Sequence, residues 1–350
     1  MKNEPKKSNN PDHVDPSRIM QIGMGFWASK ILLAAVDFDI FTLLAGGAKD
    51  AHEIKIATGM HERSLFDFLD SLVALGFLKR TGIRETAKYS NAKDVDTFLV
   101  DGKQTYIGGL LKMANHRLYR FWGTLEEGLK TGKPQNEIKL TGHSLFEALY
   151  EDHKVLEEFL NAMAGVQMAN FMALAEQFDF TPYKTLCDMG GAGGLLSILV
   201  ARKNPHMTCT SFDLLPVEPL ARKNINAMSL NGNVKTKSGD FFKDQFPSAD
   251  VITMGNILHD WGLEDKMFLM RKAYDALPEN GAYIAIENII DNGRKENAFG
   301  LMMSLNMLIE TPDGFDYSMA DFDMWAKEVG FRKTELMYLA GPTSAAIAYK

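Results

Sequence analysis

Acidic and amide side chains lie at the ends of short apolar runs in the second half of the chain. Runs of this length that alternate with helical segments are typical of a parallel sheet with crossover helices. Ligands bind outside the carboxyl ends of such strands, so we expect these side chains to line one edge of a sheet and to accept hydrogen bonds there. The runs are KTLCDMG, CTSFD, KTKSGD, DVITMGN and AYIAIEN, and the side chains are Asp188, Asp213, Asp240, Asn256 and Glu287.

A glycine cluster follows the first run and precedes an apolar helical pattern. Glycines at a strand-to-helix turn admit positive φ and let the backbone approach a ligand. Taken alone, the cluster also fits a glycine-rich surface turn. Asp213 lies 23 positions after Gly190, close to the ~20-residue spacing at which an acid on the second strand binds ribose hydroxyls. The pair therefore indicates a nucleoside site.

The nucleoside is predicted to be neither a dinucleotide nor a triphosphate. The G-x-G-x-x-G frame is broken, because Leu196 stands where the last glycine belongs, and the chain has no Walker sequence. In GDFF, Asp240 can accept a hydrogen bond from the amino group of adenine. Either Phe241 or Phe242 offers a flat face for stacking, and we expect the other to pack in the core.

Composition excludes several classes of protein. The chain has 350 residues and a net charge of -7, so neither nucleic acid nor an anionic membrane is expected as its main partner. Its two cysteines, Cys187 and Cys209, lie in apolar runs and indicate buried thiols in a reducing compartment. The polar N-terminus lacks the apolar centre of a secretion signal, and we found no membrane-spanning run of ~20 residues. We expect a cytoplasmic protein whose first ~15 residues lack fixed structure.

The first half of the chain is predicted to be mainly helical. Residues 19–44 are apolar at helical spacing, so their apolar face must be buried against other residues. A second copy of the chain is the preferred interpretation for what buries it. Residues 50–99 follow the order helix, turn, helix, hairpin, the outline of a winged helix. The helix that would enter a DNA groove is acidic, which disfavours DNA binding. Residues 104–178 continue in helical pattern, and Trp122 and Met163 there are candidates to face a ligand cavity.

These motifs resemble the S-adenosylmethionine (SAM)-dependent small-molecule O-methyltransferases, which include the plant caffeic acid, acetylserotonin and bacterial antibiotic-tailoring enzymes. DMGGAGG is similar to the family's D-x-G-G-G-x-G cofactor loop, FDLLPV to its ribose-binding strand end and GDFF to its adenine site. ILHDW resembles its most specific signature, and IAIEN resembles the strand that carries its second catalytic residue. All five occur in the family's order, and the resemblance covers nearly the whole chain.

The resemblance implies an α/β fold and a division into domains. Residues 1–105 would form a mostly α winged-helix dimerisation domain that builds a homodimer and contributes to the partner's substrate pocket. Residues 106–350 would form the methyltransferase domain. Within it, residues 106–182 would be a helical substrate-pocket segment and residues 183–350 a Rossmann-like core with a seven-stranded, mostly parallel sheet.

The resemblance also assigns binding residues, and it implies no metal. The substrate positions are less secure than those of the cofactor. Ala192 replaces a loop glycine, Gly255 replaces a common lysine and so removes one cofactor contact, and Tyr317 replaces an arginine. The residues assigned to SAM are Asp188, Gly190, Asp213, Leu214, Asp240, Phe241 and Gly255, and those assigned to the substrate are Trp122, Met163, Asn256, Asn306 and Met307.

The implied reaction is methyl transfer to a hydroxyl of a small aromatic molecule. A neutral phenol with a pKa of about 10 is a poor nucleophile, so its proton must be removed. By the resemblance His259 is the general base, Glu287 fixes its second nitrogen, and Asp316, in GFDYS, takes the place of a further acid. The alternatives are N-methylation, decarboxylation or hydroxylation on the same fold, and a DNA-binding regulator. The intact His259 and Glu287 disfavour the former group, and the acidic charge disfavours the regulator.

Overall fold

The computed structural model describes residues 14–103, 105–142 and 153–350. The chain divides into two compact units, the first ending at Asn115 and the second beginning at His116. Each unit has its own hydrophobic core. The expectation for the polar N-terminus concerns mainly residues 1–13, and the predicted helical region includes residues 143–152. Both segments lie outside the described residues.

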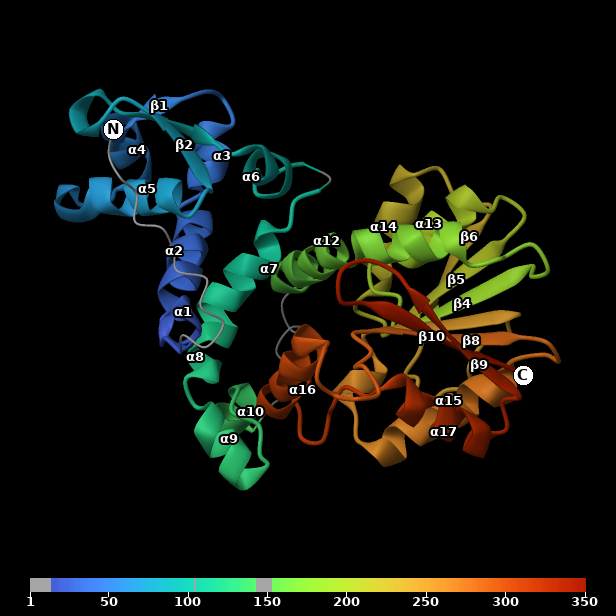
Figure 1. Ribbon diagram of the computed structural model, residues 1–350. Coiled ribbons are helices and arrows are strands. Elements are labelled where there is room, and N and C mark those ends of the chain that lie inside the picture. Colours follow the sequence, from blue (N-terminus) through green and yellow to red (C-terminus); the bar gives the residue numbers. More distant parts are fainter. Residues whose placement is uncertain (1–13, 104, 143–152) are drawn as a thin grey trace. The chain divides into compact units, whose positions relative to one another are not determined.

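The first unit is mostly helical and carries a small antiparallel sheet (Figure 1). Strands β1 (Lys49–Asp50) and β2 (Leu78–Thr81) lie on either side of β3 (Lys88–Asn91). The predicted order of helix, turn, helix and hairpin is present in α4, α5, β2 and β3. The helices and helical turns are α1 (Ser17–Gly23), α2 (Gly25–Asp37), α3 (Ile40–Leu44), α4 (Ala51–Thr58), η1 (Glu62–Ser64), α5 (Leu65–Ala74), η2 (Arg84–Thr86), α6 (Lys93–Phe98) and α7 (Gly108–Met113).

Local sequence explains the bounds of α4. The Asp50 carboxylate accepts a hydrogen bond from the backbone N of Glu53, and the Glu53 carboxylate accepts one from the backbone N of Asp50, each at 2.9 Å. This reciprocal cap satisfies two amide groups that the first helical turn leaves free. Gly59 ends the helix with a φ of 71°, which glycine adopts without steric cost.

The helical stretch Ser17–Asp37 leaves large apolar side chains on the surface of its unit. Ile19, Ile22 and Trp27 are 68%, 71% and 59% exposed. Among the described residues, this stretch is long and apolar enough to cross a membrane by length and composition, and 17% of its 18 most apolar consecutive residues are buried. The expectation of no such run is therefore corrected for this stretch. An apolar face this large is typical of an interface.

The second unit is built on a seven-stranded sheet with the order β6-β5-β4-β7-β8-β10-β9 (Figure 1). Neighbouring strands are parallel from β6 to β8, whereas β10 is antiparallel to β8 and β9. The predicted seven-stranded, mostly parallel sheet is therefore confirmed. The strands are β4 (Thr185–Met189), β5 (Thr208–Asp213), β6 (Val234–Ser238), β7 (Val251–Gly255), β8 (Ala282–Glu287), β9 (Lys333–Tyr338) and β10 (Ser344–Tyr349).

Helices cover both faces of this sheet (Figure 1). Helices α12, α13 and α14 lie on one face, and α15 and α17 lie on the other. The helices and helical turns of this unit are α8 (Tyr119–Trp122), α9 (Leu125–Thr131), α10 (Glu137–Thr141), α12 (His153–Gln177), α13 (Leu195–Lys203), α14 (Glu218–Ala227), η4 (Leu258–Asp260), α15 (Leu263–Ala276), α16 (Ala298–Glu310) and α17 (Met319–Val329), and η3 (Ala114–Leu118) spans the division between the units.

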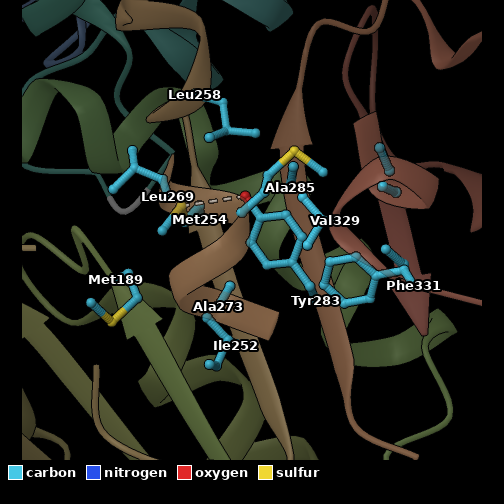
Figure 2. Packing of buried hydrophobic residues seen from close by; sticks show 14 of the residues in the cluster. Met189, Ile252, Met254, Leu258, Leu269, Ala273, Tyr283, Ala285, Val329 and Phe331 are labelled. Atoms are coloured by element: carbon cyan, nitrogen blue, oxygen red, sulfur yellow. Dashed lines mark hydrogen bonds between the residues drawn. The ribbon is translucent and has the colours of Figure 1, made fainter. Parts of the chain in front are cut away.

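Strand side chains alternate between two cores, as the period of a β-strand requires. Val251 contributes to the core under α12 and α13, whereas Ile252 and Met254 contribute to the core under α15 and α17. Figure 2 shows the latter core, where the hydroxyl of Tyr283 donates a hydrogen bond to Sδ of Met254 at 3.3 Å. Apolar side chains on both faces explain why these strands are uninterrupted apolar runs. The two free cysteines are buried as predicted.

The direction in which strands are added reverses at β4. The chain proceeds from β4 to β5 and β6 on one side, then starts again on the other side with β7 and β8. At such a reversal the loops that follow neighbouring strands separate and leave a crevice. The carboxyl ends of β4, β5, β7 and β8 carry Asp188, Asp213, Gly255 and Glu287, so the topology gathers the predicted ligand-binding residues at this edge.

Candidate active site

A tight glycine turn joins β4 to α13. Gly190 and Gly194 have φ values of 73° and 78°, which residues with a side chain rarely adopt. A Cβ at Gly190 would lie 2.5 Å from Cδ1 of Ile257, and a Cβ at Gly191 would lie 2.4 Å from Oγ of Ser211. The turn therefore presents bare backbone at the carboxyl end of β4.

The Asp213 carboxylate, at the end of β5, is bonded to this turn. Its Oδ2 accepts a hydrogen bond from the backbone N of Ala192 at 2.8 Å, and its Oδ1 accepts one from the backbone N of Leu214 at 2.7 Å. Burial raises the pKa of Asp213 to about 6. A carboxylate has about four lone-pair positions, so two backbone donors leave capacity for the hydroxyls of a ribose.

Asp188 holds the central strands together next to the turn. It is buried, its Oδ1 accepts a hydrogen bond from Oγ1 of Thr253 at 2.8 Å, and burial raises its pKa to about 7. Thr253 is the middle residue of β7, so the bond joins β4 to β7.

Aromatic side chains gather after β6. The ring centroids of Phe242 and Phe241 lie 4.5 Å and 6.2 Å from that of Trp261, both edge-to-face. Both phenylalanines pack against the core under α15, where we expected only one to do so. The Asp240 carboxylate accepts a hydrogen bond from the backbone N of Phe242 at 2.9 Å and pairs with Lys243 at 2.8 Å. The Lys243 ammonium lowers the pKa of Asp240.

Carboxylates flank both ring nitrogens of His259, which lies in η4 directly after β7. Its Nδ1 is 3.6 Å from Oε2 of Glu287 and 3.5 Å from Oδ1 of Asp316. Its Nε2 is 3.5 Å from Oδ1 of Asp260. One side-chain atom from each of His259, Glu287 and Asp316 lies within 4.8 Å of the others. The structure thus brings together the three residues that were predicted to be catalytic.

Glu287 anchors the turn that carries the histidine. It is 1% exposed, and its Oε1 accepts hydrogen bonds from the backbone N of Ile257 at 3.2 Å and of Leu258 at 3.0 Å. These two bonds fix η4 against the end of β8 and leave Oε2 on the side of His259. Glu287 therefore positions the η4 turn and also places a carboxylate oxygen near His259.

The buried charges act on one another. Burial by itself would lower the pKa of His259, but the charges of Glu287, Asp260 and Asp316 outweigh it and raise this pKa above its ordinary value. Burial raises the pKa values of Glu287 and Asp260, and the charge of His259 opposes that rise. The imidazolium form is thus stabilised by its neighbours.

Several polar atoms of this region are buried and have no hydrogen-bond partner among the described residues. Such atoms are rare in folded proteins and often mark a site that a ligand completes. They are Oδ1 of Asn256, Nδ1 of His259, Nε1 of Trp261, Oε2 of Glu287, both Oδ atoms of Asp316 and the hydroxyl of Tyr317.

Two of the predicted substrate residues form a pair. Nε1 of Trp122, in α8, donates a hydrogen bond to Oδ1 of Asn306, in α16, at 2.9 Å. Met307 follows on α16 and is 5% exposed, and Met163 is half-buried on α12. No interaction described for this unit joins Met163 to the pair. Asn256 lies separately, at the end of β7, with a φ of 52°.

Comparison with known proteins identifies the family. The model of the O-methyltransferase domain matches residues 122–332, and that of the O-methyltransferase dimerisation domain matches residues 20–101. The chain belongs to the O-methyltransferase family. The methyltransferase is 36% identical to the tetracenomycin polyketide synthesis 8-O-methyl transferase TcmO of Streptomyces glaucescens, over 96% of this chain and 97% of that protein.

Other relatives agree with this assignment. The 3-hydroxy-5-methyl-1-naphthoate 3-O-methyltransferase of Streptomyces sahachiroi is 28% identical over 95% of this chain and 94% of its own length. Human N-acetylserotonin methyltransferase in complex with SAM superposes with a TM-score of 0.89 at 26% identity, over 97% of this chain and 99% of that chain. The protein is a SAM-dependent O-methyltransferase with a dimerisation domain, and its cofactor is SAM.

The residues of the methyltransferase fit SAM. The turn has no room for a Cβ at Gly190 or Gly191, so it presents bare backbone, and Asp213 keeps acceptor capacity for ribose hydroxyls. The aromatic group after β6 includes the indole of Trp261, whose Nε1 is unpartnered in the described part of the chain. These features match a nucleoside better than a phosphate, because the carboxylates of Asp188 and Asp213 repel an anion.

The three departures from the family pattern have different surroundings. Ala192 has a φ of 47°, so this alanine occupies the conformation in which a glycine is unstrained. Gly255 lies where Phe171 of α12 approaches, because a Cβ would be 3.3 Å from its ring. Tyr317, the third departure, is 1% exposed and belongs to the core under α17.

From the sequence, Asp260 is a further candidate to assist His259, although an adjacent residue generally points elsewhere. Its Oδ1 lies 3.5 Å from Nε2 of His259. Sequence reasoning assigned no individual role to Trp261 or to Lys266. Trp261 could have been noticed as the last residue of ILHDW, whereas a lysine inside an amphipathic helix gives no signal that it is buried.

Proposed function

We propose that this methyltransferase acts on a hydroxyl group of a small aromatic molecule and that His259 removes the hydroxyl proton. One observation carries the proposal. Nδ1 of His259 faces Glu287 at 3.6 Å and Asp316 at 3.5 Å. Two carboxylates face Nδ1, whereas one, that of Asp260, faces Nε2. The neutral ring therefore keeps its proton on Nδ1 and offers Nε2 as the acceptor.

The carboxylates around His259 stabilise its protonated form. When Nε2 takes a proton, the imidazolium lies between Glu287 and Asp316 on one side and Asp260 on the other. Their negative charges stabilise the proton that has been removed. The two backbone bonds to Glu287 Oε1 hold the η4 turn in place before the reaction, so that no reorganisation is needed.

The cofactor-binding roles follow the strand ends. Asp213 binds the ribose hydroxyls of SAM, and Leu214 lies next to that site. Gly190 lets the backbone approach the methionine part of SAM. Asp240 accepts from the adenine amino group beside Phe241. Asp188 acts by holding β4 to β7, and Gly255 leaves room at the end of β7. When bound, SAM supplies a methyl group on a good neutral leaving group, so the chain needs only to deprotonate the acceptor and align it in line with that methyl.

An aromatic acceptor is supported by the residues around Trp122. The Trp122 indole, fixed by Asn306, offers a flat face, and Met163 and Met307 are adaptable apolar side chains. Oδ1 of Asn256, directly after β7, has no hydrogen-bond partner in the part of the chain that the structure describes. Relatives at 28% identity are named for 3-hydroxy-5-methyl-1-naphthoate and acetylserotonin, both aromatic. The acceptor of this enzyme is therefore proposed to be a phenol-like hydroxyl.

N-methylation is the second candidate, because one relative is the N,N-dimethyltransferase OxyT of Streptomyces rimosus, 29% identical over 90% of each chain. An amine is already nucleophilic when neutral, so it needs His259 less than a hydroxyl does. Dependence on His259 therefore separates the two reactions.

The dimerisation domain supports a homodimer formed through the apolar face of Ser17–Asp37. We place this role in the predicted domain 1–105 and catalysis in 106–350. The net charge of -7 and the two buried free cysteines favour a cytoplasmic enzyme without a nucleic-acid or membrane partner. No residue role in this proposal requires a metal.

The test is a methyl-transfer screen with SAM labelled in its methyl group. The acceptors are phenols, hydroxyindoles, flavonoids, quinones and hydroxynaphthoates, each with a matched aryl amine. Label on oxygen, with one S-adenosylhomocysteine formed per product, is expected. Label only on the amines would favour N-methylation, and product formed without S-adenosylhomocysteine would contradict methyl transfer.

A further inference from the structure

A buried glutamate at the end of α16 has one carboxylate oxygen without a hydrogen-bond partner. The side chain of Glu310 is 11% exposed. Its Oε1 is buried and has no partner within residues 14–103, 105–142 and 153–350. A buried oxygen that stays unpaired costs free energy, so each such atom in a folded protein calls for an explanation. The proposed reaction gives Glu310 no role.

The other oxygen of this carboxylate is held by an arginine. Nη1 of Arg117, in η3, lies 2.5 Å from Oε2 of Glu310. The same guanidinium donates from Nε to Oε1 of Glu137 at 2.6 Å and from Nη2 to Oε2 of Glu137 at 2.5 Å. Arg117 therefore binds Glu137 with two hydrogen bonds and Glu310 with one ion pair. When both carboxylates are ionised, the three side chains together carry one negative charge.

Backbone contacts fix the turn of α16 that carries Glu310. Nδ2 of Asn136, which is 0% exposed, donates a hydrogen bond to the backbone O of Glu310 at 2.8 Å. The backbone N of Gln135 donates one to the backbone O of Ile309 at 2.9 Å. Because Arg117 also holds Oε2, Glu310 is fixed at its backbone and at its carboxylate, and Oε1 has a defined place.

Glu310 lies next to the residues that are proposed to bind the acceptor. It follows Asn306 by four positions, so the two side chains lie on the same face of α16. Asn306 accepts a hydrogen bond from Trp122 at 2.9 Å, and Trp122 follows Arg117 by five positions. One helical segment therefore binds both side chains. The unpartnered oxygen belongs to the same face of α16 as the proposed acceptor site.

The end of α16 is also close to the catalytic group. Thr311, the next residue, accepts a hydrogen bond through its Oγ1 from the backbone N of Gly314 at 2.8 Å. A Cβ at Gly314 would lie 2.6 Å from the backbone O of His259, so this turn passes directly against η4. Burial raises the pKa of Glu310, and the charge of Asp260 adds to the rise. Glu310 thus adjoins both the proposed acceptor site and the proposed base.

We propose that Oε1 of Glu310 accepts a hydrogen bond from a second donor group of the aromatic acceptor, a hydroxyl or N–H other than the hydroxyl that is methylated. This inference rests on the proposed function, because it takes the acceptor to be an aromatic hydroxyl compound. The bond pairs the oxygen that the protein leaves free. A substituent that cannot donate leaves this oxygen unpaired and is disfavoured. Glu310 is therefore a specificity residue, which Arg117 holds in place.

The test measures kcat/KM for pairs of acceptors that differ in one group. The acceptors are the isomers of dihydroxynaphthalene and of dihydroxyanthraquinone. Each is paired with its monomethyl ether, which keeps the reacting hydroxyl and carries methoxy in place of the other. The unaltered enzyme is expected to prefer the dihydroxy compound by about tenfold or more in at least one pair. Equal kcat/KM in every pair, or a preference for the ethers, would overturn the inference, and this comparison needs no variant.

Two variants of Glu310 assign the preference to this residue. Glu310→Gln turns its carbonyl oxygen toward Arg117, because a guanidinium only donates, and so places an amide NH₂ where the free oxygen was. Glu310→Met removes both oxygens. Each variant leaves Arg117 paired with Glu137, and each is expected to reduce the preference about tenfold.

Glu137→Gln is the matched control, because it changes the other partner of Arg117 and leaves the Glu310 carboxylate in place. It is expected to keep the preference of the unaltered enzyme. A preference that persists undiminished in a folded Glu310→Gln or Glu310→Met protein would contradict the role of Glu310.

The same assay separates this inference from the proposed function. Methylation of none of these compounds on oxygen would contradict the proposed function and the inference that depends on it. Methylation on oxygen with a ratio of kcat/KM that does not depend on Glu310 would contradict the inference alone. The SAM Kd is expected to be the same in all four proteins, because Glu310 is not among the residues proposed to bind the cofactor.

Discussion

Nδ1 of His259 lies 3.5 Å from Oδ1 of Asp316, although the histidine follows a strand of the sheet and the aspartate lies in the loop between α16 and α17. The loop is held by a hydrogen bond from the backbone N of Asp316 to Oγ of Ser304 at 3.1 Å. The second acid of the base is therefore supplied by a loop that α16 positions, and α16 also carries Asn306. In the proposed function, binding of the acceptor and positioning of the base therefore depend on this same helix.

Replacing Glu287 by Gln should weaken the base without releasing the η4 turn. The Gln carbonyl can still accept from Ile257 and Leu258, but the negative charge that raises the His259 pKa is lost. The His259 pKa therefore falls, so the acidic limb of the kcat profile moves to lower pH and the plateau falls about tenfold or more. The measurement is kcat from pH 5 to 9. A limb at unchanged pH would argue that Glu287 acts only through its backbone bonds.

Two substitutions in the glycine turn should act in opposite directions. Ala192→Gly removes a side chain from a residue with a φ of 47° and should raise the free energy of unfolding by up to about 1 kcal/mol. Gly190→Ala places a Cβ 2.5 Å from Ile257 Cδ1 and should lower it by about 1–3 kcal/mol while weakening SAM binding. Denaturant unfolding and calorimetric SAM titration test both. If both variants lowered the free energy of unfolding equally, Ala192 would not be strained in this turn.

The hydrogen bond between Trp122 and Asn306 should matter for the acceptor and not for SAM. Trp122→Phe keeps an aromatic face but leaves Oδ1 of Asn306 without its donor. We expect the acceptor KM to rise about tenfold, with an unchanged SAM Kd. A double-mutant cycle with Asn306→Leu should give a coupling energy of about 1 kcal/mol. Additive effects would mean that the pair does not act as a unit.

The apolar face of Ser17–Asp37 should be required for dimerisation. Ile22 is 71% exposed and Trp27 is 59% exposed, and burying such side chains between two copies stabilises a dimer by about 1.5–3 kcal/mol each. Ile22→Asp combined with Trp27→Ser should shift the protein from dimer to monomer in light scattering. Ile56→Asp, at a 71% exposed position of α4, is the matched control. If the Ile56→Asp protein also lost the dimer, the loss in the double variant could not be assigned to the apolar face of Ser17–Asp37.

The fold was predictable where local pattern and topology agree. Short apolar runs between helical segments specify a parallel sheet. A polar residue at the end of each run specifies which edge of the sheet binds ligand, so the positions of Asp213 and Glu287 at that edge could be predicted. The sequence left the role of Asp260 open because adjacent residues usually diverge, whereas the 3-10 turn η4 brings its carboxylate back to Nε2 of His259. Lys266 could not be found, since burial of a lysine depends on what α17 and its loop pack against it, which no local pattern encodes.

The central claim is that His259 takes the proton of the acceptor hydroxyl, and acceptor acidity tests it most directly. The rates of the unaltered enzyme and His259→Ala are compared with two phenols of similar shape, one with a pKa near 10 and one already ionised at pH 7. The account predicts a loss of about 10²-fold or more for the weakly acidic phenol and a much smaller loss for the ionised one, with the same SAM Kd in both proteins. Equal losses for the two phenols would contradict it.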